Sequence, residues 1–102
     1  MEPRRDQFLL IVLDADVSSK DHAEIMRFIK EDDGISAWWH HMKPAYIVRT
    51  QYDPDDITDN ILNILDVSRF IVVNANMGEI NGWVPEKAWS WIRKQTRKYP
   101  AS

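Results

Sequence analysis

The chain contains no cysteine, and this absence removes several kinds of chemistry at once. Disulfide bonds, thiolate nucleophiles and cysteine-ligated zinc sites are all excluded. Long hydrophobic runs are missing as well, because the apolar run Phe8–Leu13 ends at Asp14. Such a run is too short for the core of a signal peptide or for a transmembrane span. We therefore expect a soluble, cytoplasmic protein without a membrane partner.

The composition is that of one domain of ordinary globular type. The chain has 102 residues, close to the commonest domain size, and we assign residues 1–102 to a single domain with a polar tail at residues 1–6. Hydrophobic residues make up 44%, which argues against wholesale disorder. The formal net charge of −3 argues against indiscriminate binding to nucleic acid, although it is compatible with a local basic patch.

Apolar runs separated by turn and capping residues predict four strands and three helices. Ser18 followed by Asp21 is typical of a helix start, and Asp53-Pro54 predicts a second one. The predicted order is a strand at residues 8–13, a helix from about residue 19 to Gly34, strands at 35–42 and 46–48 joined by a Lys43-Pro44 turn, a helix from Pro54, a strand at 69–74, and a last helix at 84–98.

This order of elements predicts an α+β fold of the ferredoxin-like type. We expect a two-layer βαββαβ sandwich, in which a four-stranded antiparallel sheet carries two helices on one face and the C-terminal helix is an addition. The chief alternative takes residues 35–50 as one bent strand and leaves a three-stranded sheet.

Two tryptophans and two histidines stand side by side at residues 38–41, within the second predicted strand. Successive side chains of a strand point to opposite faces, so Trp38 and His40 are expected on one face and Trp39 and His41 on the other. Diverging side chains are poor ligands for a single metal ion. We therefore interpret the two histidines as satisfied or solvated rather than as a metal site.

The predicted strands carry apolar side chains on both faces, although a two-layer fold leaves one sheet face without helices. This face is too apolar to stay in water. We expect the last helix, through Trp89 and Ile92, to cover part of it and a second copy of the chain to cover the rest, which predicts a homodimer. Trp83 and Trp89 are expected to fix that helix to the domain. The dimer or partner face is expected to include Trp38, Trp39, His40, His41 and Arg49.

An alternative is that these aromatic side chains stack nucleic-acid bases. RNA-binding sheets place exposed aromatics among basic and glycine residues on their central strands, whereas the first and fourth strands here carry aliphatic side chains. The basic residues Arg93, Lys94, Arg97 and Lys98 can also bind phosphates, but they are equally typical of a helix end that complements the helix dipole. We favour the structural interpretation of both features.

Asp14 and Asp16 follow the first predicted strand two residues apart, so both carboxylates can point to one place. Carboxylate oxygens suit Mg²⁺ or Mn²⁺, and a two-fold dimer would pair the two copies of the site in an arrangement that favours phosphodiester hydrolysis. The alternative is that these residues only end a strand and start a loop. The sequence offers no nucleophile constellation, and residues 77–82 lack the lysine and the spacing of a phosphate-binding loop.

Several segments resemble those of a family of small bacterial and phage proteins labelled SinR-like, which is distinct from the helix-turn-helix repressor of that name. The chain is also similar in layout to the small CRISPR-adaptation endonucleases, and this resemblance implies a ferredoxin-like dimer with a metal-binding aspartate at the position of Asp14. It departs from those nucleases at Ala37–His41, where they carry a basic, polar segment. The segments that carry the resemblance are Ile11–Asp14, Ser36–His40, Ala45–Thr50 and, most specifically, Asn81–Ile92.

Two functions follow from these observations. We favour a dimeric module that binds a protein or nucleic-acid partner without catalysis, and the sequence identifies no cofactor for it. The alternative is a magnesium- or manganese-dependent endonuclease that cleaves RNA or DNA through Asp14, assisted by Asp16.

Overall fold

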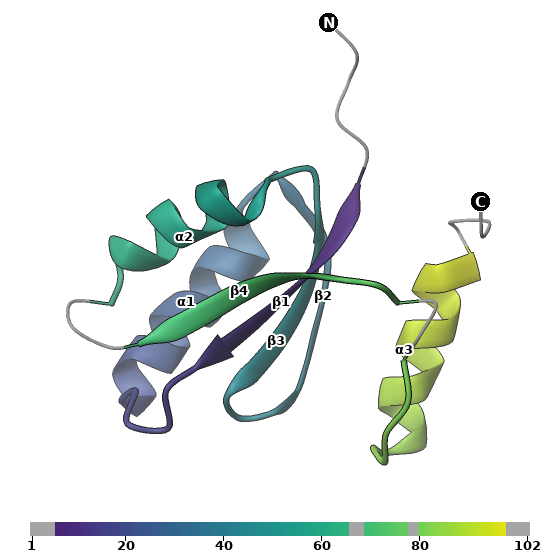
Figure 1. The fold of residues 1–102 in the computed structure, drawn as a ribbon. Helices are drawn as coiled ribbons and strands as arrows, with labels where there is room; N and C mark the ends of the chain where they lie inside the picture. Colours follow the sequence, from purple (N-terminus) through teal and green to yellow (C-terminus); the bar gives the residue numbers. More distant parts are fainter. Residues whose placement is uncertain (1–5, 66–68, 78–79, 98–102) are drawn as a thin grey trace, which may run out of the picture.

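The structure is a computed structural model that describes residues 6–65, 69–77 and 80–97, without the side chains of residues 96 and 97. Figure 1 shows the arrangement of its strands and helices. In chain order these are β1 (Gln7–Leu13), α1 (Ser19–Glu31), β2 (Ile35–Met42), β3 (Ala45–Thr50), α2 (Pro54–Leu62), β4 (Phe70–Ala75) and α3 (Glu86–Arg97).

The strands form one four-stranded sheet in the order β2-β3-β1-β4, and every neighbouring pair is antiparallel. The prediction of an α+β fold with a four-stranded antiparallel sheet is therefore confirmed, and the arrangement is compatible with a ferredoxin-like fold. The alternative of one bent strand over residues 35–50 is wrong, because β2 and β3 are separate strands that pair with each other, with Trp39 opposite Ile47. The Lys43-Pro44 pair forms the turn between them.

Both predicted helix starts are present, and local hydrogen bonds explain them. The Ser18 hydroxyl accepts a hydrogen bond from the backbone N–H of Asp21 at 3.1 Å, which caps α1. At α2, the carboxylate of Asp56 accepts a hydrogen bond from the backbone N–H of Asp53 at 3.1 Å, and Pro54 occupies the first turn. Helix α1 ends at Glu31, slightly before the predicted stop at Gly34.

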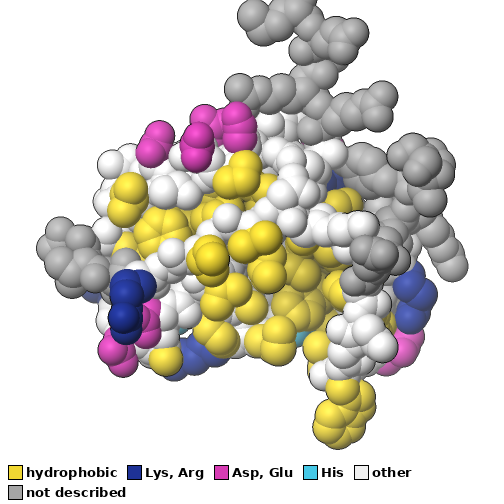
Figure 2. Space-filling model, viewed as in Figure 1, with side chains coloured by type: hydrophobic (Ala, Val, Ile, Leu, Met, Phe, Trp, Pro, Cys, Tyr) yellow, Lys and Arg dark blue, Asp and Glu magenta, His cyan; other side chains and the backbone are white. Residues whose placement is uncertain are grey.

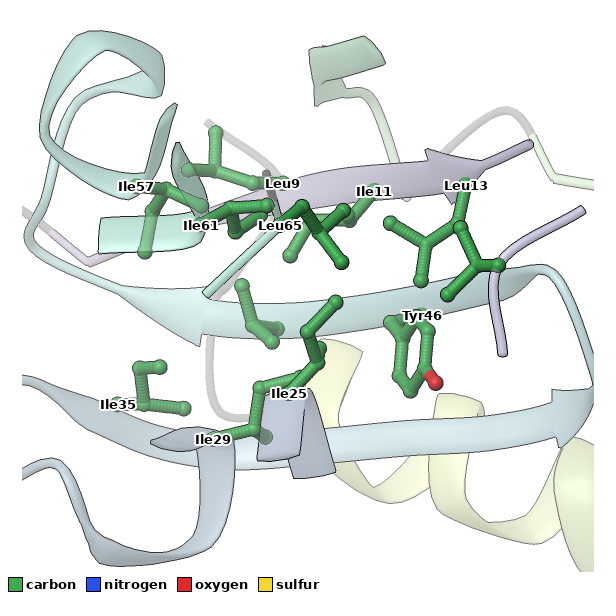
Figure 3. Close-up of a cluster of buried hydrophobic side chains, with 12 residues drawn as sticks. Leu9, Ile11, Leu13, Ile25, Ile29, Ile35, Tyr46, Ile57, Ile61 and Leu65 are labelled. Carbon is green, nitrogen blue, oxygen red and sulfur yellow. The ribbon is translucent and has the colours of Figure 1, made fainter. Parts of the chain in front are cut away.

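The main core lies between α1, α2 and one face of the sheet, which we call the helix face. Helix spacing places Ile25 and Ile29 on the inner side of α1, and Ile57 and Ile61 on the inner side of α2. The ring of Tyr46, on β3, is fully buried among these side chains (Figure 3). Strands β1 and β3 contribute Leu9, Ile11, Leu13, Tyr46 and Val48 to this core.

The other face of the sheet, which we call the second face, is covered in part by α3. Figure 1 shows α3 on the side of the sheet away from α1 and α2. Trp39 and Ile47 are buried beneath Ala88 and Ile92, and Trp89 packs against this second cluster. The prediction that Trp89 and Ile92 cover part of the second face is therefore confirmed.

The prediction that Trp83 fixes α3 to the domain is wrong. Its side chain is 100% exposed, whereas Trp89 is half-buried against the second cluster. Trp83 precedes α3 in an irregular segment that runs along the rim of the second face. In an irregular segment, the path of the backbone determines whether a side chain reaches the core. The large apolar side chain of Trp83 was therefore not enough to predict its burial.

Candidate functional site

The aromatic residues of β2 divide between the two sheet faces, as the alternation of strand side chains predicts. Trp38 lies on the helix face, where the ammonium group of Lys30, from α1, stands 5.4 Å from its ring centroid. Trp39 is buried in the second cluster, and its ring lies 5.1 Å from that of His41. The same stretch therefore packs on two sides of the sheet.

His40 has a partner within the chain. Its ring stacks on the ring of Tyr46 at a centroid distance of 4.0 Å and an interplanar angle of 7°. Its Nδ1 atom lies 3.0 Å from the carbonyl oxygen of Ala45, which can only accept, so this nitrogen carries the proton. His40 is thus a packed and hydrogen-bonded histidine, which is the interpretation that we favoured.

A third histidine, which sequence reasoning did not single out, belongs to the same cluster. The Nδ1 atom of His22, from the first turn of α1, lies 2.6 Å from the hydroxyl oxygen of Tyr46. Burial lowers the pKa of His22, and the positive charges of Lys43 and His40 lower it further. Burial also raises the pKa of Tyr46. The signal for this contact was a tyrosine inside an apolar strand, because a buried phenol needs a hydrogen-bond partner.

Arg49, predicted on the partner face, is engaged within the chain. Its Nε atom lies 3.2 Å from the carboxylate of Asp6, and one of its terminal nitrogens donates to the Gln95 side-chain oxygen at 3.3 Å. These contacts connect the end of β3 to the N-terminal segment and to α3. The guanidinium group therefore contributes to the attachment of α3.

Asp14 and Asp16, the predicted metal ligands, lie in the loop after β1. The carboxylate of Asp14 accepts a hydrogen bond from the Arg69 Nε–H at 2.9 Å and one from the backbone N–H of Asp16 at 3.4 Å. The hydrogen bond from Arg69, followed by that from Asp16, lowers the pKa of Asp14. Across the part of the chain that the structure describes, no three His, Cys, Asp or Glu side chains gather as a metal site would require.

The structure describes only part of the predicted basic group on the last helix. Arg93 is paired with Glu86, one of the first residues of α3, and Lys94 is exposed. The side chain of Arg97 and the whole of Lys98 lie outside the described residues. The pairing of Arg93 reduces the charge that this helix can offer to a phosphate.

An apolar groove of about 340 Å³ lies on the second face, between the sheet, α3 and the segment that leads into α3. Its lining includes Leu10, Met42 and Ile47 from the strands, Met77 from the segment after β4, and Trp89 from α3. We call it the second-face groove. Nearly all of its lining side chains are uncharged and apolar, so it suits an apolar occupant.

Exposed apolar side chains extend the groove across the sheet. Val73 and Ile71, on β4, pair with Leu10 and Val12 of β1 and therefore share the second face with them. They are 43% and 58% exposed, and Met42 is 49% exposed. Figure 2 shows hydrophobic side chains gathered on this side of the molecule. Contiguous exposed apolar patches are uncommon on protein surfaces and are typical of binding surfaces.

Comparisons with known proteins do not place the chain in a family. No family model, no curated protein and no solved structure matches it. The resemblance to the SinR-like proteins and to the CRISPR-adaptation endonucleases therefore stays a prediction. Within the described residues, no helix has the length and apolar character needed to cross a membrane.

Proposed function

We propose that the protein is a ferredoxin-like binding module without catalytic activity, which forms a homodimer and binds through the second face of its sheet. The observation that carries the proposal is the second-face groove together with the exposed side chains of Met42, Ile71 and Val73. Helix α3 covers only part of this face, so a partner surface is needed to remove the rest from water.

The composition of the second face supports a protein partner. Tryptophan and methionine are enriched at the cores of protein interfaces, and charged residues are depleted there. Trp39, Trp89, Met42 and Met77 all line the second-face groove. Methionine side chains adapt their shape to a partner, which suits a surface that binds another protein.

The charges do not favour nucleic acid. Binding to a phosphate backbone requires unpaired lysine and arginine side chains on one surface. Here Arg49 is paired with Asp6, Arg93 is paired with Glu86, and the chain as a whole carries a net charge of −3. We therefore take a protein surface, beginning with a second copy of the chain, as the partner.

Sedimentation equilibrium over a wide range of protein concentration tests the proposal. We expect the wild type to sediment as a dimer, and Val73→Lys to shift the equilibrium toward the monomer because it places a charge in the apolar face. Leu62→Lys is the matched control, since Leu62 is 56% exposed but lies on α2, on the other side of the sheet. A wild type that stays monomeric at every concentration would refute the proposal.

The endonuclease alternative rests on one observation, the position of Asp14 after the end of β1, where the resemblance implies a metal ligand. Arg69 donates a hydrogen bond to one oxygen of the Asp14 carboxylate, so a metal ion bound there would have to displace or share this contact. Cleavage of labelled single-stranded RNA and double-stranded DNA with Mg²⁺, by the wild type and by Asp14→Asn, decides the matter. Activity that disappears in the folded variant would establish the nuclease, whereas equal results for both proteins would remove it.

A further inference from the structure

We propose that Trp83 of one copy inserts into the second-face groove of a second copy, and that the exchange is reciprocal. This inference rests on the proposed homodimer and specifies its central contact. It assigns a role to the fully exposed tryptophan, which packing within one chain does not explain.

Trp83 is presented to solvent by the backbone that precedes it. Gly82 has φ of +156°, a value that L side chains rarely adopt, and an added Cβ there would meet nothing within 4 Å. There is therefore room for a side chain at position 82, and it is the backbone conformation that favours glycine there. The side chain of Asn81 accepts a hydrogen bond from the Gly82 N–H at 2.8 Å. Trp83 therefore follows a glycine whose backbone conformation other residues rarely adopt, and its side chain projects into solvent.

The second-face groove has the size and lining to accept an indole ring. Its volume of about 340 Å³ is near the lower end of the range for ligand pockets, which suits one large side chain better than an extended ligand. Trp39 and Trp89 offer aromatic surfaces, against which a further ring can pack edge to face or offset. Met42 and Met77 can adjust around it.

The position of Trp83 points to a second copy as the occupant. Trp83 is one of the residues that line the groove of its own chain, although its side chain is fully exposed, so the projecting residue and the receiving surface lie on the same face of one chain. A two-fold axis near the rim would place each Trp83 in the groove of the other copy, as a self-complementary interface requires. Ile71, Val73 and the groove are uncharged, so no like charges meet across such an axis.

Buried aromatic anchors that enter a partner pocket carry much of the energy of an interface. We therefore expect Trp83→Ala to raise the dimer dissociation constant by about tenfold or more in sedimentation equilibrium. Trp38→Ala is the matched control, because Trp38 is an exposed tryptophan (38%) on the helix face, beside α1. It should leave the dissociation constant unchanged.

Three outcomes separate this inference from the proposal on which it rests. If the wild type and the control dimerise and Trp83→Ala does not, both the homodimer and the exchange of Trp83 are supported. A wild-type dimer that Trp83→Ala does not weaken overturns the exchange and leaves the dimeric module standing. A wild type without any dimer overturns both. Trp83 makes no buried contact in the single chain, so its replacement should leave the helix and strand content of the monomer, measured by far-ultraviolet circular dichroism, unchanged.

Fluorine NMR of protein labelled with 5-fluorotryptophan provides a second readout. The Trp83→Phe variant identifies the resonance of Trp83, and dilution then follows its environment. We expect this resonance to move with protein concentration, from a solvent-exposed position in dilute samples to a buried one in concentrated samples. A resonance that is buried at every dilution would show that Trp83 closes on the groove of its own chain, which would overturn the exchange.

Discussion

The Nδ1 atom of His22 lies 2.6 Å from the hydroxyl oxygen of Tyr46, and this contact joins the first turn of α1 to strand β3. The ring of His40 stacks on the same tyrosine. A buried phenol with one histidine at its hydroxyl and another on its ring makes the packing of α1 on the sheet sensitive to histidine protonation.

The first prediction concerns acid sensitivity. Burial lowers the folded-state pKa of His22 from the unfolded value of 6.5, so the unfolded chain binds more protons in the interval between the two values. The free energy of unfolding should therefore fall as the pH drops below about 6.5. Urea denaturation at about pH 7.5 and about pH 5.5 measures this loss, which should be smaller in His22→Gln. An equal loss in the variant would contradict the assignment to His22.

The second prediction concerns the Asp14–Arg69 pair. Its hydrogen bond lowers the pKa of Asp14, so Arg69→Ala should move that pKa back toward its ordinary value of 3.8. A titration of the Asp14 carboxyl carbon by NMR measures the change. Arg69 is 89% exposed at its side chain, and exposed pairs contribute little to stability, so the urea midpoint should hardly change. An unchanged Asp14 pKa in the variant would show that the pair does not persist in solution.

The third prediction concerns Gly34, immediately before β2. A Cβ at this position would overlap the ring of Tyr52, whose hydroxyl donates a hydrogen bond to Asp32 at 2.8 Å. Gly34→Ala should therefore displace the tyrosine and lower the free energy of unfolding by about 1–3 kcal/mol. Chemical denaturation measures the loss. If the overlap is the cause, the double variant Gly34→Ala with Tyr52→Ala should have the same free energy of unfolding as Tyr52→Ala alone. A loss equal to the sum of the two single losses would refute this cause.

The fourth prediction compares neighbouring residues of α2. Ile61 is fully buried in the main core, whereas Leu62 is 56% exposed. Ile61→Ala should lower the free energy of unfolding by about 2–5 kcal/mol, because it leaves a cavity. Leu62→Ala should change it by no more than about 0.5 kcal/mol. Similar losses in the two variants would mean that α2 packs in a different rotation.

Much of the fold could be predicted because the local signals agree with one another. Ser18 and Asp53 mark the helix starts in the sequence, and both cap helices in the structure. Ile57 and Ile61, four residues apart, share the buried side of α2, as the period of a helix requires. The division of Trp38 and Trp39 between two sheet faces followed from the period of a strand.

The candidate site was harder to predict because its contacts join distant parts of the chain. Asp14 and Asp16 are close in sequence, which suggested a shared metal, whereas the contact between Asp14 and Arg69 spans 55 residues and no local pattern announces it. His22 and Tyr46 meet only when α1 packs on β3. Trp83 is exposed because of the path of the segment before α3, which no residue pattern specified.

Hydrogen exchange measured by mass spectrometry, at low and high protein concentration, tests the central claim most directly. If the second face is the interface, peptides from β4 and from residues 80–84 should exchange more slowly in the concentrated sample, while peptides from α1 and α2 should be unchanged. Exchange that does not depend on concentration, or that slows only in α1 and α2, would contradict the account.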